Sequence, residues 1–126
     1  MIPAWSEDLL RQALSVPAGP SSDYDLNPDV APLPGSLRPA GVLAAFHEDD
    51  GRLILTKRAS GLRHHPGQIA LPGGKVDPTD ADEIAAALRE AREEVGLDAA
   101  QVDLLGTLPP HRTVTGFAVT PVIGIV

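Results

Sequence analysis

Four glutamates gather in one short stretch of the sequence, and their type and spacing suit metal chemistry. They are Glu83, Glu90, Glu93 and Glu94. At about 100° per residue on a helix, three of them share one side and Glu93 lies beside them. Carboxylates three or four residues apart repel one another, but Mg²⁺ prefers such hard oxygen ligands. The pattern fits a divalent cation site, or a solvated acidic face neutralised by neighbouring arginines.

A helix over residues 83–95 would position these carboxylates. Asp80 or Asp82 can cap its start, where acidic residues suit the helix dipole, and Gly96 supplies the stop. The opposite side of this helix is apolar and is expected to pack on the domain: Ile84, Leu88, Ala91 and Val95. Before the helix, the pair Gly73-Gly74 predicts a tight turn.

The order of residues in this stretch resembles the Nudix box. Arg89-Glu90-Ala91 is followed by Glu93-Glu94 and Gly96-Leu97, which matches Arg-Glu-apolar-x-Glu-Glu-x-Gly-apolar at every specified position. The first half of the box departs from the signature. Five residues separate Gly74 from Asp80, which stands in place of glutamate, and the gap from Asp80 to Arg89 is one residue longer than in the signature.

The residues upstream narrow the resemblance to the coenzyme A pyrophosphatases. Their motif, Leu-Leu-Thr-x-Thr-Ser/Ala, Arg, Gly and Phe-Pro-Gly-Gly, is matched by residues 54–74 with the same spacing from Ala59 onward. Arg58 replaces the second threonine, and Leu71 replaces phenylalanine. Motif and box together cover residues 54–97.

The resemblance implies Mg²⁺ as cofactor, with Mn²⁺ as an alternative, and roles for individual residues. Glu90, Glu94 and Glu93 are the expected metal ligands, with Glu90 or Glu93 also acting on the attacking water. Arg89 is expected to orient the glutamates by ion pairing. Substrate binding is expected from residues that carry phosphate-binding groups or form the glycine turn: Arg63, Lys57, Arg58, His65, Gln68, Gly73 and Gly74.

The candidate substrate-binding residues are not equally well supported. Arg63 is favoured, because a guanidinium binds phosphate in a bidentate way. Lys57 and Arg58 are adjacent, so on a strand only one of them can face the site. His64 and His65 are equally supported as substrate-binding residues, and both less so than Arg63. His111 and Arg112 are expected in a solvated loop that could border the site.

The implied reaction is hydrolysis of the diphosphate bond of coenzyme A or its acyl derivatives, giving 3′,5′-ADP and 4′-phosphopantetheine. Magnesium would offset the diphosphate charge and lower the pKa of a bound water. Two alternatives stay open. One is a Nudix hydrolase for ADP-ribose, dinucleotides or nucleoside triphosphates, and the other is a non-catalytic nucleotide-binding module.

Composition and charge limit the partners. The chain has 126 residues, enough for one domain, and no cysteine, which fits the cytoplasm. A net charge of −7 argues against nucleic-acid binding. However, residues 38–75 hold six Lys or Arg against three acidic residues, which suits a small polyanionic substrate. No apolar run of membrane-spanning length and no signal peptide are visible.

The remaining elements predict an α+β fold. A helix is expected over residues 6–15 and an irregular Pro-rich arm over 16–39. Strands are expected over 40–48, 52–57, 69–71, 102–108 and 115–126, with a loop at 109–114. The resemblance implies a Nudix fold, an α/β/α sandwich around a mixed sheet, in residues 40–126 after an N-terminal part of residues 1–39. A second main helix is missing after residue 97, so the domain is expected to be C-terminally incomplete, and a homodimer is an open alternative.

Overall fold

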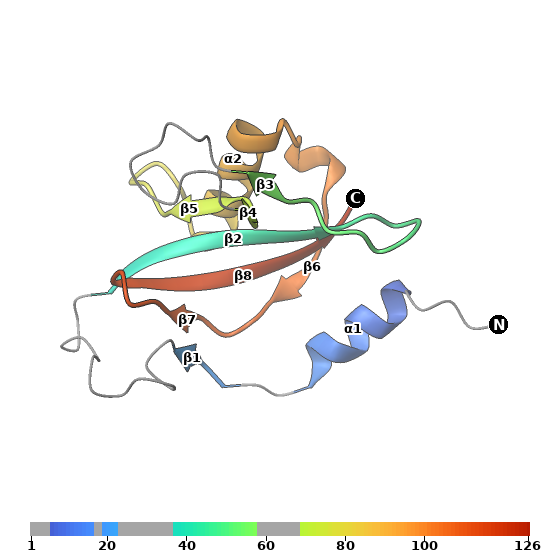
Figure 1. Cartoon of the computed structure of the whole chain (residues 1–126), viewed down its shortest axis with the longest axis horizontal. Coiled ribbons are helices and arrows are strands. Elements are labelled where there is room, and N and C mark those ends of the chain that lie inside the picture. The colour runs from blue at the N-terminus through green and yellow to red at the C-terminus, as the bar shows by residue number, and fades with distance from the viewer. Residues whose placement is uncertain (1–5, 17–18, 23–36, 58–68) are drawn as a thin grey trace.

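The structure is a computed structural model that describes residues 6–16, 19–22, 37–57 and 69–126. Among these residues, six strands form a mixed sheet in the order β1-β7-β8-β2-β5, with β6 also paired to β8, and β3 and β4 form a second, two-stranded sheet (Figure 1). The elements are α1 (Glu7–Ser15), β1 (Ser21–Ser22), β2 (Arg38–Phe46), β3 (Thr56–Lys57), β4 (Ile69–Ala70), β5 (Gly73–Lys75), α2 (Glu83–Val95), the 3₁₀ helix η3 (Ala99–Gln101), β6 (Asp103–Thr107), β7 (His111–Arg112) and β8 (Phe117–Ile125).

Strands β2 and β8 form the centre of the sheet. They run parallel over nine residue pairs, from Arg38 beside Phe117 to Phe46 beside Ile125. Pro121 lies inside β8, where its partner on the other side changes from β7 to β6. Its carbonyl accepts a hydrogen bond from the Leu108 N–H on that side. Since the N–H and C=O of a strand residue point to the same edge, the missing N–H of proline removes no hydrogen bond to β2.

The two longer helices lie at different ends of the sheet. In Figure 1, α2 lies beside β5 and β2, and α1 lies at the other end beside β6. Ser6 caps α1 by accepting a hydrogen bond from the Leu9 N–H at 3.1 Å, as the sequence predicted. Among residues 98–126, all of which the structure describes, the only helix is the 3₁₀ helix η3, so this part of the chain has no second main helix, as expected.

Small side chains bring α2 close to the sheet. One cluster of buried apolar residues in the core consists of Leu43, Ala45, Ala87, Ala91 and Val122. A Cβ atom on Gly41 would lie 2.1 Å from the backbone oxygen of Glu83, so any larger residue at this position would push the helix away. The predicted apolar side of the helix is confirmed, because Ile84, Leu88 and Val95 pack against this core.

The glycine pair Gly73-Gly74 does not form the predicted turn. Both residues belong to β5, which pairs antiparallel with β2 through Gly73 beside Val42 and Gly74 beside Gly41. A Cβ on Gly73 would lie 2.3 Å from the Gly41 carbonyl oxygen. Glycine is therefore needed here for close approach of two strands rather than for chain reversal.

Three further expectations need correction. The arm over residues 16–39 is not wholly irregular, because Ser21–Ser22 form β1 and β2 starts at Arg38. The loop over 109–114 contains β7, which pairs with β8. The strand over 52–57 is regular only at β3, although a bridge between Phe46 and Leu53 confirms the hairpin. These short strands exist through pairing with distant partners, which local sequence patterns do not reveal.

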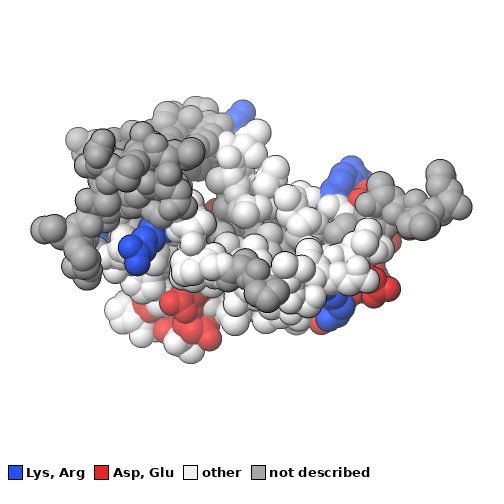
Figure 2. Space-filling model, turned by 90° about the horizontal axis from the view of Figure 1, so that it is seen from below, with Lys and Arg blue, Asp and Glu red and all other residues white. Residues whose placement is uncertain are grey.

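Charged side chains are unevenly distributed over the surface. Seen from below the view of Figure 1, charged side chains form one group left of the centre and another right of it, with mostly uncharged surface between the two groups (Figure 2). No helix in the described part of the chain has the length and apolar character needed to cross a membrane.

Candidate active site

Helix α2 carries the carboxylates, and its two ends are capped by side chain and backbone. The carboxylate of Asp82 accepts a hydrogen bond from the Ala85 N–H at 2.9 Å, which makes it the N-cap. Gly96 ends the helix in the left-handed conformation, at φ 70°. The sequence had left Asp80 and Asp82 as alternative caps, and the structure selects Asp82. Capping at both ends limits the helix to Glu83–Val95, and within it the helical period of 3.6 residues sets which residues share a side.

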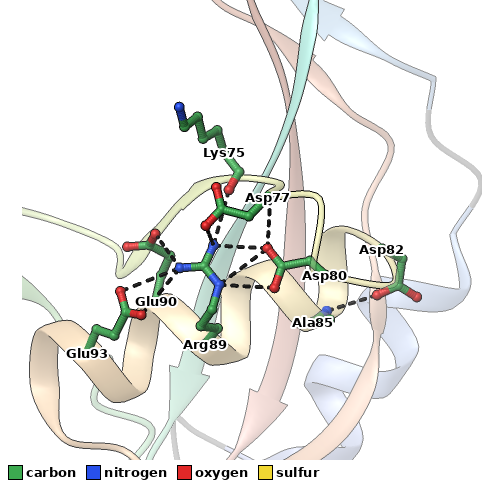
Figure 3. A network of polar contacts seen from close by, with 8 residues as sticks. All are labelled: Lys75, Asp77, Asp80, Asp82, Ala85, Arg89, Glu90 and Glu93. Carbon is green, nitrogen blue, oxygen red and sulfur yellow. Dashed lines mark hydrogen bonds and ion pairs between the residues drawn. The ribbon is translucent and has the colours of Figure 1, made fainter.

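Asp80 instead forms the closest ion pair of the site (Figure 3). Its two carboxylate oxygens accept hydrogen bonds from Arg89, at 3.0 Å from Nε and 2.9 Å from Nη2. The Asp80 side chain is only 5% exposed and the Arg89 side chain 25%. The pKa of Asp80 is lowered, first by the hydrogen bond from Arg89 and then by the backbone N–H of Asp77. The Asp80 carboxylate in turn raises the pKa of Arg89.

Arg89 also holds two of the glutamates. Its Nη1 lies 3.0 Å from an oxygen of Glu90 and 3.4 Å from an oxygen of Glu93 (Figure 3). Its Nη2 donates to the backbone carbonyl of Lys75 on β5 at 3.4 Å. The expected ion pairing of Arg89 with the glutamates is confirmed for Glu90 and Glu93. One guanidinium thus connects the segment before α2, the helix itself and strand β5.

Glu90 lies directly against β5. A Cβ atom on Gly74 would approach the Glu90 carboxyl group to 2.9 Å, so the carboxylate occupies the space that a larger residue would need. Its side chain is 22% exposed, against 59% for Glu93. Glu94, one turn further along α2, is exposed. The helix therefore presents a graded series, from the half-buried Glu90 to the open Glu93 and Glu94.

The carboxylates outnumber the cation that pairs with them. Arg89 forms ion pairs with four acidic side chains: Asp77, Asp80, Glu90 and Glu93. One guanidinium against four carboxylates leaves a surplus of three negative charges in this cluster. In the described residues no three acidic, histidine or cysteine side chains are close enough to hold a metal ion together. The carboxylate oxygens and the surplus negative charge are nevertheless of the type that binds a hard divalent cation.

The other predicted site residues are placed less centrally. Lys57 lies on β3 with an exposed side chain, paired in register with Ile69 of β4. His111 and Arg112 form β7, which β8 and β2 separate from β5, and Nδ1 of His111 lies 2.7 Å from the hydroxyl of Ser21. The remaining predicted residues lie outside the described residues: Arg58, Arg63, His64, His65 and Gln68.

Sequence reasoning missed two residues of the site. Asp77 and Asp80 precede the helix, and only the fold shows that they meet Arg89. A signal for Asp80 was present, because five residues separate it from Gly74, which is the position where the box expects an acid. The additional residue between Asp80 and Arg89 does not prevent their pairing.

A mixed sheet that carries an Arg-Glu-x-x-Glu-Glu helix against a Gly-Gly strand defines the class of protein. The model of the NUDIX domain matches residues 37–124, well over half of the chain. The chain belongs to the Nudix family, and the predicted Nudix fold is confirmed.

Relatives support this assignment at the level of the family. An uncharacterized Nudix hydrolase, NudL, of Enterobacter sp. (strain 638) is 64% identical over 74 residues, which are 59% of this chain and 38% of that protein. The NudL of Cronobacter sakazakii is 52% identical over 102 residues, 80% of this chain and 53% of that protein. The chain thus spans about two-fifths to half of the length of these curated relatives.

Among solved structures, RenU, a Nudix hydrolase from M. smegmatis, is 28% identical with a TM-score of 0.56, covering 70% of this chain and 60% of that one. An Ap4A hydrolase of C. elegans has a TM-score of 0.52 at 24% identity, covers 68% of this chain and 64% of that one, and shows likeness of fold alone.

Proposed function

We propose that the protein hydrolyses the diphosphate bond of coenzyme A or an acyl-coenzyme A, giving 3′,5′-ADP and 4′-phosphopantetheine. Membership of the Nudix family supports hydrolysis of a diphosphate. The observation that carries the proposal is the network in which Arg89, held by Asp80, keeps Glu90 and Glu93 on one side of α2. The choice of coenzyme A rests on the resemblance of residues 54–74 to the coenzyme A pyrophosphatase motif.

The proposed reaction gives different roles to different residues of this chain. Glu90, pressed against Gly74 and 22% exposed, is proposed to orient or deprotonate the attacking water, with Glu93 beside it. The half-buried position suits a base better than full exposure would. Asp80 is a positioning residue, because it reaches the glutamates only through Arg89. Arg63, with Lys57, Arg58, His65 and Gln68, is proposed to bind the phosphates of the substrate.

A divalent cation is part of the proposal. Glu90, Glu93 and Glu94 are proposed to hold Mg²⁺, and the surplus negative charge around Arg89 supports this choice. Mn²⁺ is the alternative ion. When bound, the cation would supply positive charge against the diphosphate and acidify a water molecule. Because Arg89 Nη1 contacts both Glu90 and Glu93, it would compete with a bound cation for the same oxygens, and the ion pair of Arg89 with Asp80 would limit that competition.

A hydrolysis panel tests the proposal. The protein is incubated with Mg²⁺ and coenzyme A, acetyl-coenzyme A, ADP-ribose, a dinucleoside polyphosphate or a nucleoside triphosphate, and products are resolved by chromatography. The expected result is the highest kcat/KM for coenzyme A or its acyl form. A higher kcat/KM for ADP-ribose would show that the protein is an ADP-ribose hydrolase instead. Binding of nucleotides without turnover would show that the domain is a non-catalytic nucleotide-binding module.

Arg63→Ala sharpens the choice among substrates. Loss of a bidentate guanidinium is expected to raise KM about tenfold or more for coenzyme A. Dephospho-coenzyme A, which lacks the 3′-phosphate, is expected to be affected less. Equal effects on both substrates would show that Arg63 does not recognise the 3′-phosphate. The proposed role of the carboxylates would be unaffected by that result. Arg92→Ala, on α2, serves as the control for loss of one arginine.

A further inference from the structure

The guanidinium of Arg89 uses every donor that it has. A guanidinium carries five N–H groups. Nε and Nη2 donate to the Asp80 carboxylate at 3.0 and 2.9 Å, and Nη2 also donates to the Lys75 carbonyl at 3.4 Å. Nη1 donates to Glu90 at 3.0 Å and to Glu93 at 3.4 Å. Each N–H group therefore has an acceptor, and the two on Nη1 are given to proposed metal ligands.

Asp77 lies beside this network without accepting one of those five hydrogen bonds. Its Oδ2 is 3.4 Å from Nη2 of Arg89, whose two N–H groups already have acceptors (Figure 3). The Asp77 side chain is 41% exposed, against 5% for Asp80. The backbone N–H of Asp77 donates to the Asp80 carboxylate at 2.9 Å, which keeps Asp77 next to the ion pair. Asp77 is thus a spare acceptor within reach of the guanidinium.

The positive charge of Arg89 lies where the proposed cation would bind. Nη1 contacts both Glu90 and Glu93, and within the described ranges no three acidic, histidine or cysteine side chains are close enough to share a metal ion. These side chains therefore have to rearrange before they can hold a cation together. A guanidinium a few ångströms away repels a divalent cation, so binding is easier when Nη1 moves away.

We infer that Arg89 is a removable counter-charge of Glu90 and Glu93, which a divalent cation displaces toward Asp77 while the two hydrogen bonds to Asp80 persist. A ligand shifts an equilibrium between two arrangements by its different affinity for each, and Asp77 stabilises the arrangement that binds the cation. Asp77 is then a positioning residue, because it reaches the glutamates only through Arg89. The inference rests on the proposed role of a cation and is independent of the substrate.

Binding of Mg²⁺ without substrate, measured by isothermal titration, tests the inference in Arg89→Gln. Removing the competing positive charge is expected to tighten Mg²⁺ binding about fivefold or more. If Arg89 only oriented the glutamates, the same change would weaken Mg²⁺ binding. Arg92→Gln, which removes the other arginine of α2, is the matched control and is expected to leave the affinity unchanged.

Asp77→Asn removes the spare acceptor and leaves the five hydrogen bonds of Arg89 in place. It is expected to weaken Mg²⁺ binding about two- to fivefold, the range of an exposed ion pair, with no loss of thermal stability in the absence of the ion. In the Arg89→Gln background the same change is expected to have no effect, because the coupling passes through Arg89. Asp82→Asn, which removes one charge at the helix N-cap, is the control.

NMR of the unchanged protein during a Mg²⁺ titration supplies a measurement that needs no variant. Signals of the Arg89 side-chain N–H groups and of the Asp77 backbone N–H are expected to shift. The Ala85 N–H, which donates to Asp82, is expected to stay constant.

Three results would overturn the inference. They are weaker Mg²⁺ binding in Arg89→Gln, an equal effect of Asp77→Asn in both backgrounds, and no binding of Mg²⁺ or Mn²⁺ to the unchanged protein. If Arg89→Gln tightens Mg²⁺ binding but coenzyme A is not hydrolysed, the proposed function fails and the inference stands. If coenzyme A is hydrolysed but Arg89→Gln weakens Mg²⁺ binding, the reverse holds.

Discussion

The two faces of the sheet at β2 and β5 are built differently. On the α2 face, Gly41 and Gly74 leave no room for a Cβ atom, and the buried Ala87 and Ala91 allow the helix to approach. On the other face, Ala40 and Val42 border an open cavity. Close packing restrains the charged side chains of the helix, while the open face can accept a ligand. The comparison shows that the same two strands pack tightly against a helix on one face and leave accessible surface on the other.

The largest effect is expected from removing a charge on the α2 face. Glu94→Gln keeps the shape of the side chain, removes a proposed metal ligand and is expected to lower kcat about a hundredfold or more, with little change in stability. Steady-state kinetics with Mg²⁺ measure it. Glu83→Gln, in the first turn of the same helix, is the control and is expected to retain normal turnover. Near-normal turnover of Glu94→Gln would refute the proposed role of Glu94 as a metal ligand.

A smaller loss is expected when the anchor of Arg89 is weakened. Asp80→Asn removes the charge that holds Arg89, so the guanidinium is expected to pair more strongly with Glu90 and Glu93. Activity is expected to fall about 10- to 100-fold, and the Mg²⁺ concentration for half-maximal rate is expected to rise.

Asp82→Asn, the same change at the helix N-cap, is the matched control and is expected to leave the Mg²⁺ requirement unchanged. Asp80→Glu is expected to restore part of the activity. An unchanged Mg²⁺ requirement in Asp80→Asn would mean that Asp80 supports the fold without positioning the glutamates.

Two neighbouring glycines allow the comparison to be made within β5. Gly73→Ala places a methyl group against the backbone of β2, so it is expected to cost about 1–3 kcal/mol in the free energy of unfolding, measured by urea denaturation. In Gly74→Ala the new methyl group meets the carboxyl end of Glu90, which can move. Stability should then change less, but kcat is expected to fall about tenfold. Equal effects of the two substitutions on both measurements would contradict this assignment.

The smallest expected effect is on the pH dependence of stability. The pKa of Asp80 is lowered in the folded protein, so Asp80 binds fewer protons there than in the unfolded chain. Its contribution is therefore present above the ordinary pKa of an aspartate and is lost as the pH falls through the lowered value. Thermal unfolding between neutral and strongly acidic pH is expected to show a shallower acid-induced loss in Asp80→Asn than in the unchanged protein. An identical slope would show that the ion pair does not contribute.

Much of the candidate site was predictable, because α2 is a local structure. The spacing of Ile84, Leu88, Ala91 and Val95 predicted the packed side, and Gly96 predicted the end of the helix, as observed. The ion pairing of Arg89 with neighbouring glutamates was also predicted correctly. The glycine pair was misassigned, because the same residues suit a turn and a closely packed strand.

By itself, the sequence determined the family, the helix and the order of the glutamates along it, since these depend on residues a few positions apart. Only the tertiary structure decided that Asp80 meets Arg89, that Gly74 leaves space for Glu90, and that Phe117 of β8 lines the same cavity as β5. Such contacts depend on the pairing of β2 with β5 and β8 and on the distance of α2 from the sheet. Register and packing distance arise from many residues acting together, so no short motif specifies them.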